Sequence, residues 1–351
     1  MNSPLSETHL ENAAEERIWK FDHVELGKVE VQLEPNARAL RMVLESERVS
    51  LALALTVSSS QAVSVSDWHA STRSGEVKHA RFAVMLCFDF LFSLYKTLQH
   101  IGLNKEMTYL LPQQLSADLQ VSRVGFYQWP ELWLTKQLEY PEARVYTETN
   151  GVRHPVRPPQ PVGDVYRRFV PEVAKTLSFR PIDPVADLDV FHQWMNDSRV
   201  AAAWELDKPK EELAQYLQQR AQDPHMYSVV GSFDGELFGY FELYWTPEDR
   251  LGPYYEASDY DRGVHLLVGN RKFLGGNYFY CWFTGLLHQI FLEDPRTERV
   301  MGEPRADNQV LLRHTQSVVS FKKMKEFDFP HKRAALMQCE RDAFFELVSL
   351  P

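Results

Sequence analysis

Cysteine and basic residues are both in short supply in this 351-residue chain. The three cysteines, Cys87, Cys281 and Cys339, lie far apart and form no CxxC pair, which excludes a disulfide framework and a cysteine-based zinc site. Lys and Arg number 38 against 48 Asp and Glu, and a net charge of -10 argues against a nucleic-acid partner, which needs a basic surface. We therefore expect no bound metal, no nucleic acid and a reducing cytoplasmic compartment.

Apolar segments long enough for a membrane are also lacking. Residues 49–57 are too short, and residues 82–98 are interrupted by Asp89 and Lys96, whereas a spanning helix needs about 20 apolar residues. The first 16 residues are polar and acidic, without the basic-then-apolar order of a signal peptide. The chain is expected to have no membrane partner.

Several common catalytic motifs are missing as well. The sequence contains no GxSxG elbow, no HExxH, no GxGxxG and no Walker loop. This excludes the usual serine-hydrolase, zinc-protease, dinucleotide-binding and P-loop patterns.

What is present indicates two domains with well-filled cores. The chain is 44% hydrophobic and 13% aromatic, and it is long for one core. Prolines 155, 158, 159 and 161 predict an extended connector, because proline disfavours both helix and strand ladder. We expect a non-catalytic mixed α/β domain over residues 1–150, a connector over 151–170 and a catalytic domain over 171–351.

The pattern after the connector predicts an α/β fold of the α+β type. Asp234-Gly235 between two apolar runs is typical of a β-hairpin. An apolar strand over residues 264–268, a helix over 278–292 and a strand over 299–303 follow. A strand–helix–strand order with so long a connection indicates a parallel βαβ unit beside the hairpin.

Two features of this unit could support chemistry. His265 stands in an otherwise apolar strand, where it could act as a general base or be a core histidine bonded to a carbonyl. Gly275 and Gly276 precede a helix, where backbone amides can approach a phosphate, although glycines are also common in turns. Arg271 and Lys272 could add positive charge there.

Other candidates lie on both sides of this unit. Asp328 alternates with aromatic residues on its strand and is either a catalytic carboxylate or a surface acid. His331 begins a basic cluster that could contact an anionic substrate or water. Trp204-Glu205 follows a helix and could present a carboxylate to a cationic substrate.

The motifs DRGVHLLVG, EPRADNQ and KEFDFPHKR, with FDGELFGYFELYW before them, resemble the siderophore-biosynthesis acyltransferases of the GNAT superfamily. The resemblance covers residues 158–345. It implies a GNAT fold, with a mixed central sheet flanked by helices, and an N-terminal half that is a degenerate GNAT-like domain. It also implies an enzyme that acylates the nitrogen of an N-hydroxylated amine from acyl-CoA to form a hydroxamate.

The same resemblance implies roles for particular residues. His265 and Asp328 match the catalytic pair, and Asn308 matches the superfamily asparagine near the pantetheine arm. Trp204, Glu205 and His331 are expected at the amine because of the chemistry described above, not because of the resemblance. The coenzyme site is expected to contain Leu267, Val268, Gly269, Arg271, Lys272, Gly275, Gly276, Asn277 and Asn308. The superfamily's phosphate loop reads Arg-Gly-x-Gly, whereas this chain has Leu274-Gly275-Gly276-Asn277, so the loop arginine is absent.

Three questions stay open at this point. The donor is acetyl-CoA, succinyl-CoA or another acyl-CoA, and the acceptor is N6-hydroxylysine, N-hydroxyputrescine or N-hydroxycadaverine. An acetyltransferase for another amine, such as an aminoglycoside, and a non-catalytic GNAT-like binding module are the alternatives. A homodimer is the expected assembly by analogy with such enzymes.

Overall fold

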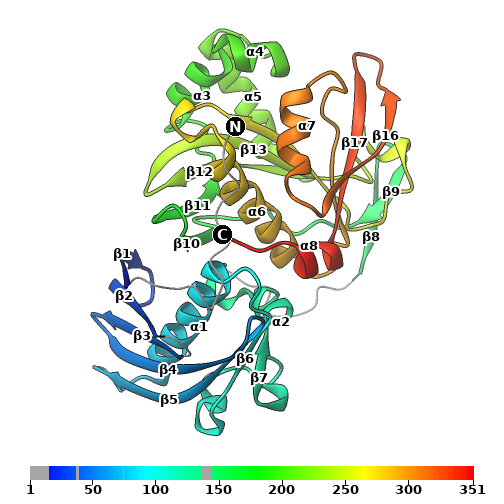
Figure 1. Cartoon of the computed structure of the whole chain (residues 1–351). Coiled ribbons are helices and arrows are strands. Elements are labelled where there is room, and N and C mark those ends of the chain that lie inside the picture. The colour runs from blue at the N-terminus through cyan, green and yellow to red at the C-terminus, as the bar shows by residue number, and fades with distance from the viewer. Residues whose placement is uncertain (1–15, 37–38, 74, 136–143) are drawn as a thin grey trace. The chain divides into compact units, whose positions relative to one another are not determined.

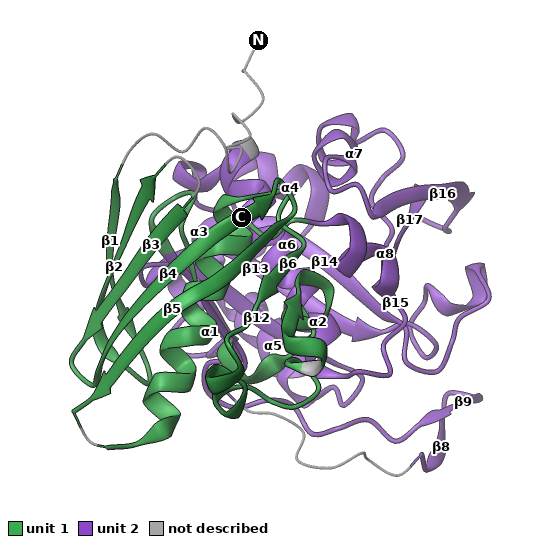
Figure 2. Cartoon of the chain, turned by 60° about the horizontal axis from the view of Figure 1, so that its bottom comes forward, with its two compact units in different colours: residues 1–132, 169–175, 349–351 green, residues 133–168, 176–348 purple. Residues whose placement is uncertain are grey.

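The computed structural model describes residues 16–36, 39–73, 75–135 and 144–351, and the remaining parts of the predicted N-terminal domain lie outside the described residues. The chain divides into two compact units (Figures 1 and 2). Unit 1 comprises residues 1–132, 169–175 and 349–351, and unit 2 comprises residues 133–168 and 176–348. Most of the proline-rich segment predicted as a connector is therefore part of unit 2.

Unit 1 is a seven-stranded sheet with the order β1-β2-β3-β4-β5-β6-β7. Its regular elements are β1 (Arg17–His23), β2 (Gly27–Asn36), β3 (Ala39–Ser46), β4 (Val49–Ser59), β5 (Ala62–Thr72), α1 (Val77–Leu94), β6 (His100–Gly102), β7 (Gln120–Ser122) and α2 (Arg123–Tyr127). Strands β1 to β5 form an antiparallel meander, and α1 then connects β5 to the parallel strand β6.

Helix α1 explains the apolar segment noted in the sequence. Its side chains are buried along most of its length, and the interrupting Asp89 accepts a hydrogen bond from the Tyr127 hydroxyl at 3.1 Å. A buried carboxylate needs such a partner, so the helix belongs to a protein core. Within the described residues, no helix has the length and apolarity needed to cross a bilayer.

Unit 2 is built on an eight-stranded mixed sheet with the order β10-β11-β12-β13-β14-β15-β17-β16. Its strands are β8 (Tyr146–Thr149), β9 (Val152–Pro155), β10 (Tyr166–Val170), β11 (Lys175–Pro181), β12 (Met226–Phe233), β13 (Glu236–Trp245), β14 (Arg262–Val268), β15 (Arg299–Gly302), β16 (Phe321–Asp328) and β17 (Arg333–Glu340). Its helices are α3 (Leu188–Met195), α4 (Ser198–Trp204), α5 (Lys210–Gln222), α6 (Gly276–Glu293), α7 (Gln309–Gln316) and α8 (Arg341–Leu347).

The sheet order confirms the parallel unit and the hairpin predicted from the sequence. Asp234 and Gly235 both have positive φ, 49° and 80°, which is the geometry of the tight turn between β12 and β13. Strands β14 and β15 are parallel and are joined by the 18-residue helix α6. The same order, antiparallel strands followed by a helical crossover to a parallel strand, occurs in unit 1.

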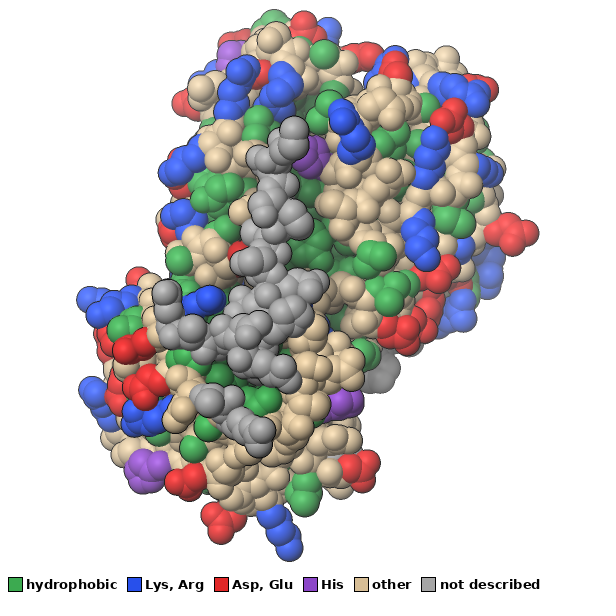
Figure 3. Space-filling view, viewed as in Figure 1, with side chains coloured by type: hydrophobic (Ala, Val, Ile, Leu, Met, Phe, Trp, Pro, Cys, Tyr) green, Lys and Arg blue, Asp and Glu red, His purple; other side chains and the backbone are tan. Residues whose placement is uncertain are grey.

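Helices cover both faces of this sheet. Trp282 of α6 stacks on Phe241 of β13 at 5.1 Å between ring centroids, which seals one face. On the other face, Phe191 and Leu217 of helices α3 and α5 pack with Tyr240 in a buried cluster. Because side chains alternate along a strand, Glu242 and Tyr244 share this second face with Tyr240. Figure 3 shows Lys, Arg, Asp and Glu side chains interspersed over the visible surface.

The segment expected to be an extended connector is in part a β-hairpin. Strands β8 and β9 pair over residues 146–155, so proline at the end of β9 did not prevent a ladder. The guanidinium of Arg157 then donates to both carboxylate oxygens of Glu248, at 2.5 and 2.6 Å, with both side chains buried. This bidentate pair fixes the proline-rich segment to the end of β13.

Candidate active site

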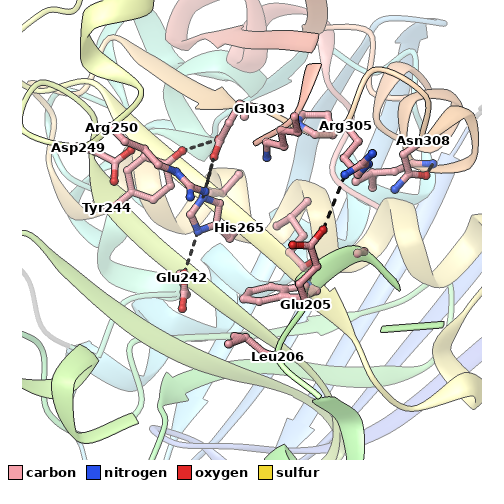
Figure 4. Close-up of a pocket in the computed structure, with 18 of the residues that line it drawn as sticks. Glu205, Leu206, Glu242, Tyr244, Asp249, Arg250, His265, Glu303, Arg305 and Asn308 are labelled. Carbon is pink, nitrogen blue, oxygen red and sulfur yellow. Dashed lines mark hydrogen bonds and ion pairs between the residues drawn. The ribbon is translucent and has the colours of Figure 1, made fainter. Parts of the chain in front are cut away.

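A cavity of about 620 Å³ opens where two neighbouring strands of the sheet in unit 2 separate. Strand β14 pairs with β15 only through Arg262 with Val300 and Gly263 with Met301, and the strands diverge beyond these residues. From Val264 onward, the edge of β14 that faces β15 is therefore not paired with that strand. Side chains from β13, β14, α4 and the segments after β15 and β16 line the cavity (Figure 4).

His265 lies at the centre of this cavity, between two carboxylates. Glu242 of β13 is its direct cross-strand partner and contacts Nδ1 at 2.8 Å. Glu303, which follows β15, contacts Nε2 at 2.8 Å. Both carboxylates are buried, while the imidazole side chain is 23% exposed to the cavity. Figure 4 shows the resulting Glu242–His265–Glu303 row.

This environment decides the charge of the imidazole. Burial alone would lower the pKa of His265, but the charges of Glu303 and Glu242 and their hydrogen bonds outweigh it and raise the pKa to about 10. Burial likewise opposes ionisation of Glu303, yet the His265 charge holds the pKa of that carboxyl well below its usual range. At neutral pH the row is therefore carboxylate, imidazolium, carboxylate, and His265 has no free lone pair with which to act as a simple base.

Three tyrosines complete the row, and one of them, Tyr216, donates its hydroxyl hydrogen to Glu242. Tyr244 donates its hydroxyl hydrogen to Glu303 at 2.6 Å, and Tyr240 donates to Glu242 at 3.0 Å. The Tyr244 ring lies 4.8 Å from the imidazole, measured between centroids. It can lie there because Gly263, its cross-strand partner, has no side chain: a Cβ at Gly263 would stand 2.1 Å from the tyrosine ring.

We expect Gly263→Ala to lower kcat without unfolding the protein. The added methyl displaces the Tyr244 ring and with it a hydrogen bond to a charged carboxylate, which is worth about 1.5–3 kcal/mol. Steady-state kinetics and a thermal melt of the same sample measure both effects. Gly235→Ala is not a suitable control, because Gly235 has positive φ and an alanine there would be strained. Ala306→Gly, in the loop after β15, is the control. Unchanged kcat in Gly263→Ala would show that the Tyr244 contact does not matter.

The structure does not bring the two residues of the expected catalytic pair together. Asp328 ends β16 with its side chain 73% exposed, and it accepts from Arg333 at 3.2 and 3.3 Å. It is not among the described residues that line the cavity. The ring nitrogens of His265 are occupied by Glu242 and Glu303, so Asp328 is not the group that orients the histidine.

The three residues expected at the amine all line the cavity. Trp204 donates its indole N–H to the Leu266 carbonyl at 3.3 Å and faces the His265 ring. Glu205, which ends α4 with a positive φ of 55°, lies 3.8 Å from Arg305. His331 lines the opposite wall. The pKa of His331 is lowered, first by burial and then by the nearby charges of Arg250 and Lys332.

Residues expected at the coenzyme fall into two groups. Asn308 lines the cavity and caps α7, since its side chain accepts from the Leu311 amide at 3.1 Å. The carbonyl of Val268 accepts from Arg199 at 2.6 Å on the open edge of β14. The Leu267 side chain is buried in the core cluster with Tyr240, and Gly269 allows close packing of Trp194, 2.1 Å from where a Cβ would stand.

The second group lies at the start of α6, beyond the cavity. Gly275 has φ of 129°, and a Cβ there would meet nothing among the described residues within 4 Å. No side chain of the part of the chain that the structure describes caps this helix, so the amides of Gly276 and Asn277 can bind an anion. Arg271 and Lys272 form surface ion pairs with Asp197 and Glu236. These residues fit a diphosphate held by backbone amides.

Glu242 and Glu303 are the two carboxylates bound to His265 that sequence reasoning missed. Glu242 left a signal in the sequence. Glu242 is the only charge within the β13 run LFGYFELYW, and a charge buried in an apolar strand requires a partner. Aligning that strand with the histidine strand as an antiparallel pair would have placed Glu242 opposite His265.

Comparison with known proteins agrees with the fold. The model of the acetyltransferase (GNAT) domain matches residues 183–329. An Escherichia coli protein named N(6)-hydroxylysine O-acetyltransferase is 40% identical over 238 residues, which cover 68% of this chain and 75% of that protein. A hydroxyornithine transacylase of Ajellomyces capsulatus is 36% identical over 73% of this chain and 65% of its own length.

A solved structure adds support for the fold. An uncharacterized protein of Bacillus halodurans aligns with a TM-score of 0.50 and 31% identity, over 53% of this chain and 94% of that protein. The predicted mixed sheet flanked by helices is confirmed. The chain belongs to the GNAT acetyltransferase family, together with the hydroxylysine and hydroxyornithine acyltransferases.

Proposed function

We propose that this protein transfers an acyl group, with acetyl-CoA as the first donor to test, to the nitrogen of an N-hydroxylated amine, forming a hydroxamate for siderophore assembly. The relatives that act on hydroxylysine and hydroxyornithine support the acceptor. The observation that carries the proposal is the Glu242–His265–Glu303 row beside the separated strands β14 and β15.

In this proposal the thioester lies along the open edge of β14. The carbonyls of Leu266 and Val268 accept from side chains of α4, which identifies the residues whose polar groups face the opening. The N–H of Leu266 points to the same side, because the N–H and C=O of one strand residue do so. It can donate to the thioester carbonyl as negative charge develops on its oxygen. The diphosphate of the donor lies at the amides that begin α6.

The reaction requires the transfer of one proton from the acceptor to the donor. A hydroxylamine nitrogen is largely neutral at pH 7, so it can attack the thioester carbon as soon as it is positioned. The new C–N bond forms, the C–S bond breaks, and the proton of the nitrogen must finally reach the sulfur of CoA. We assign this transfer to the His265 imidazolium, which gives its proton to the departing sulfur and then, as a neutral imidazole, takes the proton of the nitrogen. Glu242 keeps the imidazole oriented.

The test is an assay that follows both products. Purified protein with acetyl-CoA and N6-hydroxylysine should release free thiol and form a product that gives the coloured iron(III) complex of a hydroxamate. Acylation of the oxygen releases thiol without that colour, so the two atoms are distinguished. Lysine, which is protonated at neutral pH, should react at least 100-fold more slowly. Absence of thiol release with every hydroxylated amine, in protein that binds CoA, refutes the proposal.

A further inference from the structure

One cation on the cavity wall, Lys332, has no role in the mechanism proposed above. Lys332 lies in the turn between β16 and β17, is half-buried and lines the cavity. Among the described residues its side chain makes no hydrogen bond and no ion pair, and its ammonium group lies 5.6 Å from the centre of the Phe329 ring. Removing an ammonium group from water without an anionic partner is costly. The arrangement is therefore incomplete without a ligand.

The surroundings of Lys332 carry a surplus of positive charge. The Arg250 guanidinium lies over the same Phe329 ring at 5.6 Å, and Arg305 is a further cation of this wall. Burial and then the charges of Arg250 and Arg305 lower the pKa of Lys332, and Glu303 partly opposes them.

Arg250 and Arg305 have carboxylate partners, whereas Lys332 has none at ion-pair distance among the described residues. Arg250 lies 3.4 Å from Glu303, which His265 also contacts at 2.8 Å. Arg305 lies 3.8 Å from Glu205 and 3.3 Å from Asp307, and both of these carboxylate side chains are 73% exposed.

We propose that Lys332 binds the α-carboxylate of the acceptor, so that this enzyme prefers an N-hydroxylated amino acid to the corresponding N-hydroxylated diamine. The proposal rests on the function proposed above and concerns the same cavity. An α-carboxylate is the one permanent anion that an amino acid carries and a diamine lacks. The phosphates of the donor are expected instead at the start of α6, whose described residues do not line this cavity.

The geometry also explains why a lysine is suited to this position. The ammonium group is a point charge on a flexible chain, so it can follow acceptors of slightly different length. The buried row at His265 fixes the reacting end of the acceptor, whereas the cation on the wall selects the other end.

The test uses two acceptors that differ only in the carboxylate, N6-hydroxylysine and N-hydroxycadaverine. We expect the wild type to favour the amino acid in kcat/KM by about 10–100-fold, the usual range for a hydrogen bond to a charged group. Lys332→Gln should remove this preference by lowering kcat/KM for the amino acid alone, and Lys332→Arg should retain part of it. Lys322→Gln, on the exposed outer part of β16, is the matched control.

Each other outcome is decisive. Equal use of both acceptors by the wild type, or an equal loss for both in Lys332→Gln, overturns the carboxylate site and leaves the proposed function intact. A rise in KM for acetyl-CoA in that variant would assign Lys332 to the donor. If neither acceptor reacts, the proposed function fails, and equilibrium binding of the two compounds to the CoA-loaded protein still measures whether Lys332 distinguishes them.

Discussion

His265→Ala should lower kcat by about 100- to 10,000-fold, the range typical of a residue that transfers a proton in the transition state. The substitution removes the group that connects Glu242 to Glu303 and leaves two buried carboxylates close to each other. Steady-state kinetics with saturating acetyl-CoA and N6-hydroxylysine measure the loss. A smaller effect on KM for acetyl-CoA is expected, because the imidazole is not placed at the diphosphate.

The matched control is His192→Ala. His192 lies on α3 and is not among the described residues lining the cavity. It should retain wild-type kcat within a factor of about two. Unchanged kcat in His265→Ala, with a normal melting curve, would remove this residue from the chemistry. Partial recovery of activity in His265→Gln, which can still hydrogen-bond to one carboxylate, would point to positioning of the acceptor and against proton transfer.

Glu303→Gln should destabilise the protein by about 3 kcal/mol at pH 7, because removing one partner of a buried ion pair is strongly destabilising even though Glu242 still contacts the His265 imidazolium. Glu303 is buried and contacts His265, Tyr244 and Arg250. Glu205→Gln is the control. Its carboxylate lies on the rim of the same cavity, and an exposed substitution of this kind changes stability by about 0.5 kcal/mol or less.

The pH dependence gives this prediction a specific signature. The pKa of His265 is raised to about 10 in the folded protein, so its stabilising effect is complete below about 6.5 and is lost as the pH rises toward 10. The pKa of Glu303 is lowered, so its contribution is present above about 4.5 and is lost on acidification. The wild type should therefore lose stability between pH 7 and pH 10, by at most about 1.4 kcal/mol per pH unit for one proton.

Glu303→Gln should make this alkaline decline shallower, since the neutral amide no longer raises the pKa of His265 and Glu242 alone of the two carboxylates still does. Chemical denaturation at pH 6, 7, 8, 9 and 10 measures the slope for each protein. Parallel curves for the wild type and the variant would show that the two groups are not coupled.

The sequence predicted the elements of unit 2 well, because their signals are local. Asp234-Gly235 specifies its turn, and an apolar strand followed by an amphipathic helix specifies β14 and α6. The sequence also singled out His265, Trp204, Glu205 and His331, all of which line one cavity. The boundary near residue 150 rested on prolines alone, whereas in the structure Trp133 already belongs to unit 2.

The partners of His265 were harder to predict because they depend on register and on strand separation. Whether Glu242 meets the histidine is decided by the pairing of β13 with β14, and a shift of one residue would have turned it to the other face. Glu303 reaches the ring because β15 ends at Gly302, close to where β14 diverges. Asp328 resembles a catalytic residue in its motif, but exposure at the end of β16 leaves it paired with Arg333.

In the proposed complex, the donor lies along β14 where a longer β15 would otherwise pair with it. In the proposed complex the donor pairs with backbone N–H groups that a continuous sheet would pair, while the carbonyls of Leu266 and Val268 already accept from Trp204 and Arg199. A ligand that binds the folded form only adds to the free energy of unfolding in proportion to the logarithm of its concentration. The free energy of unfolding of this enzyme should therefore rise with the concentration of acyl-CoA in the cell. Its lifetime should then depend on the availability of its own substrate.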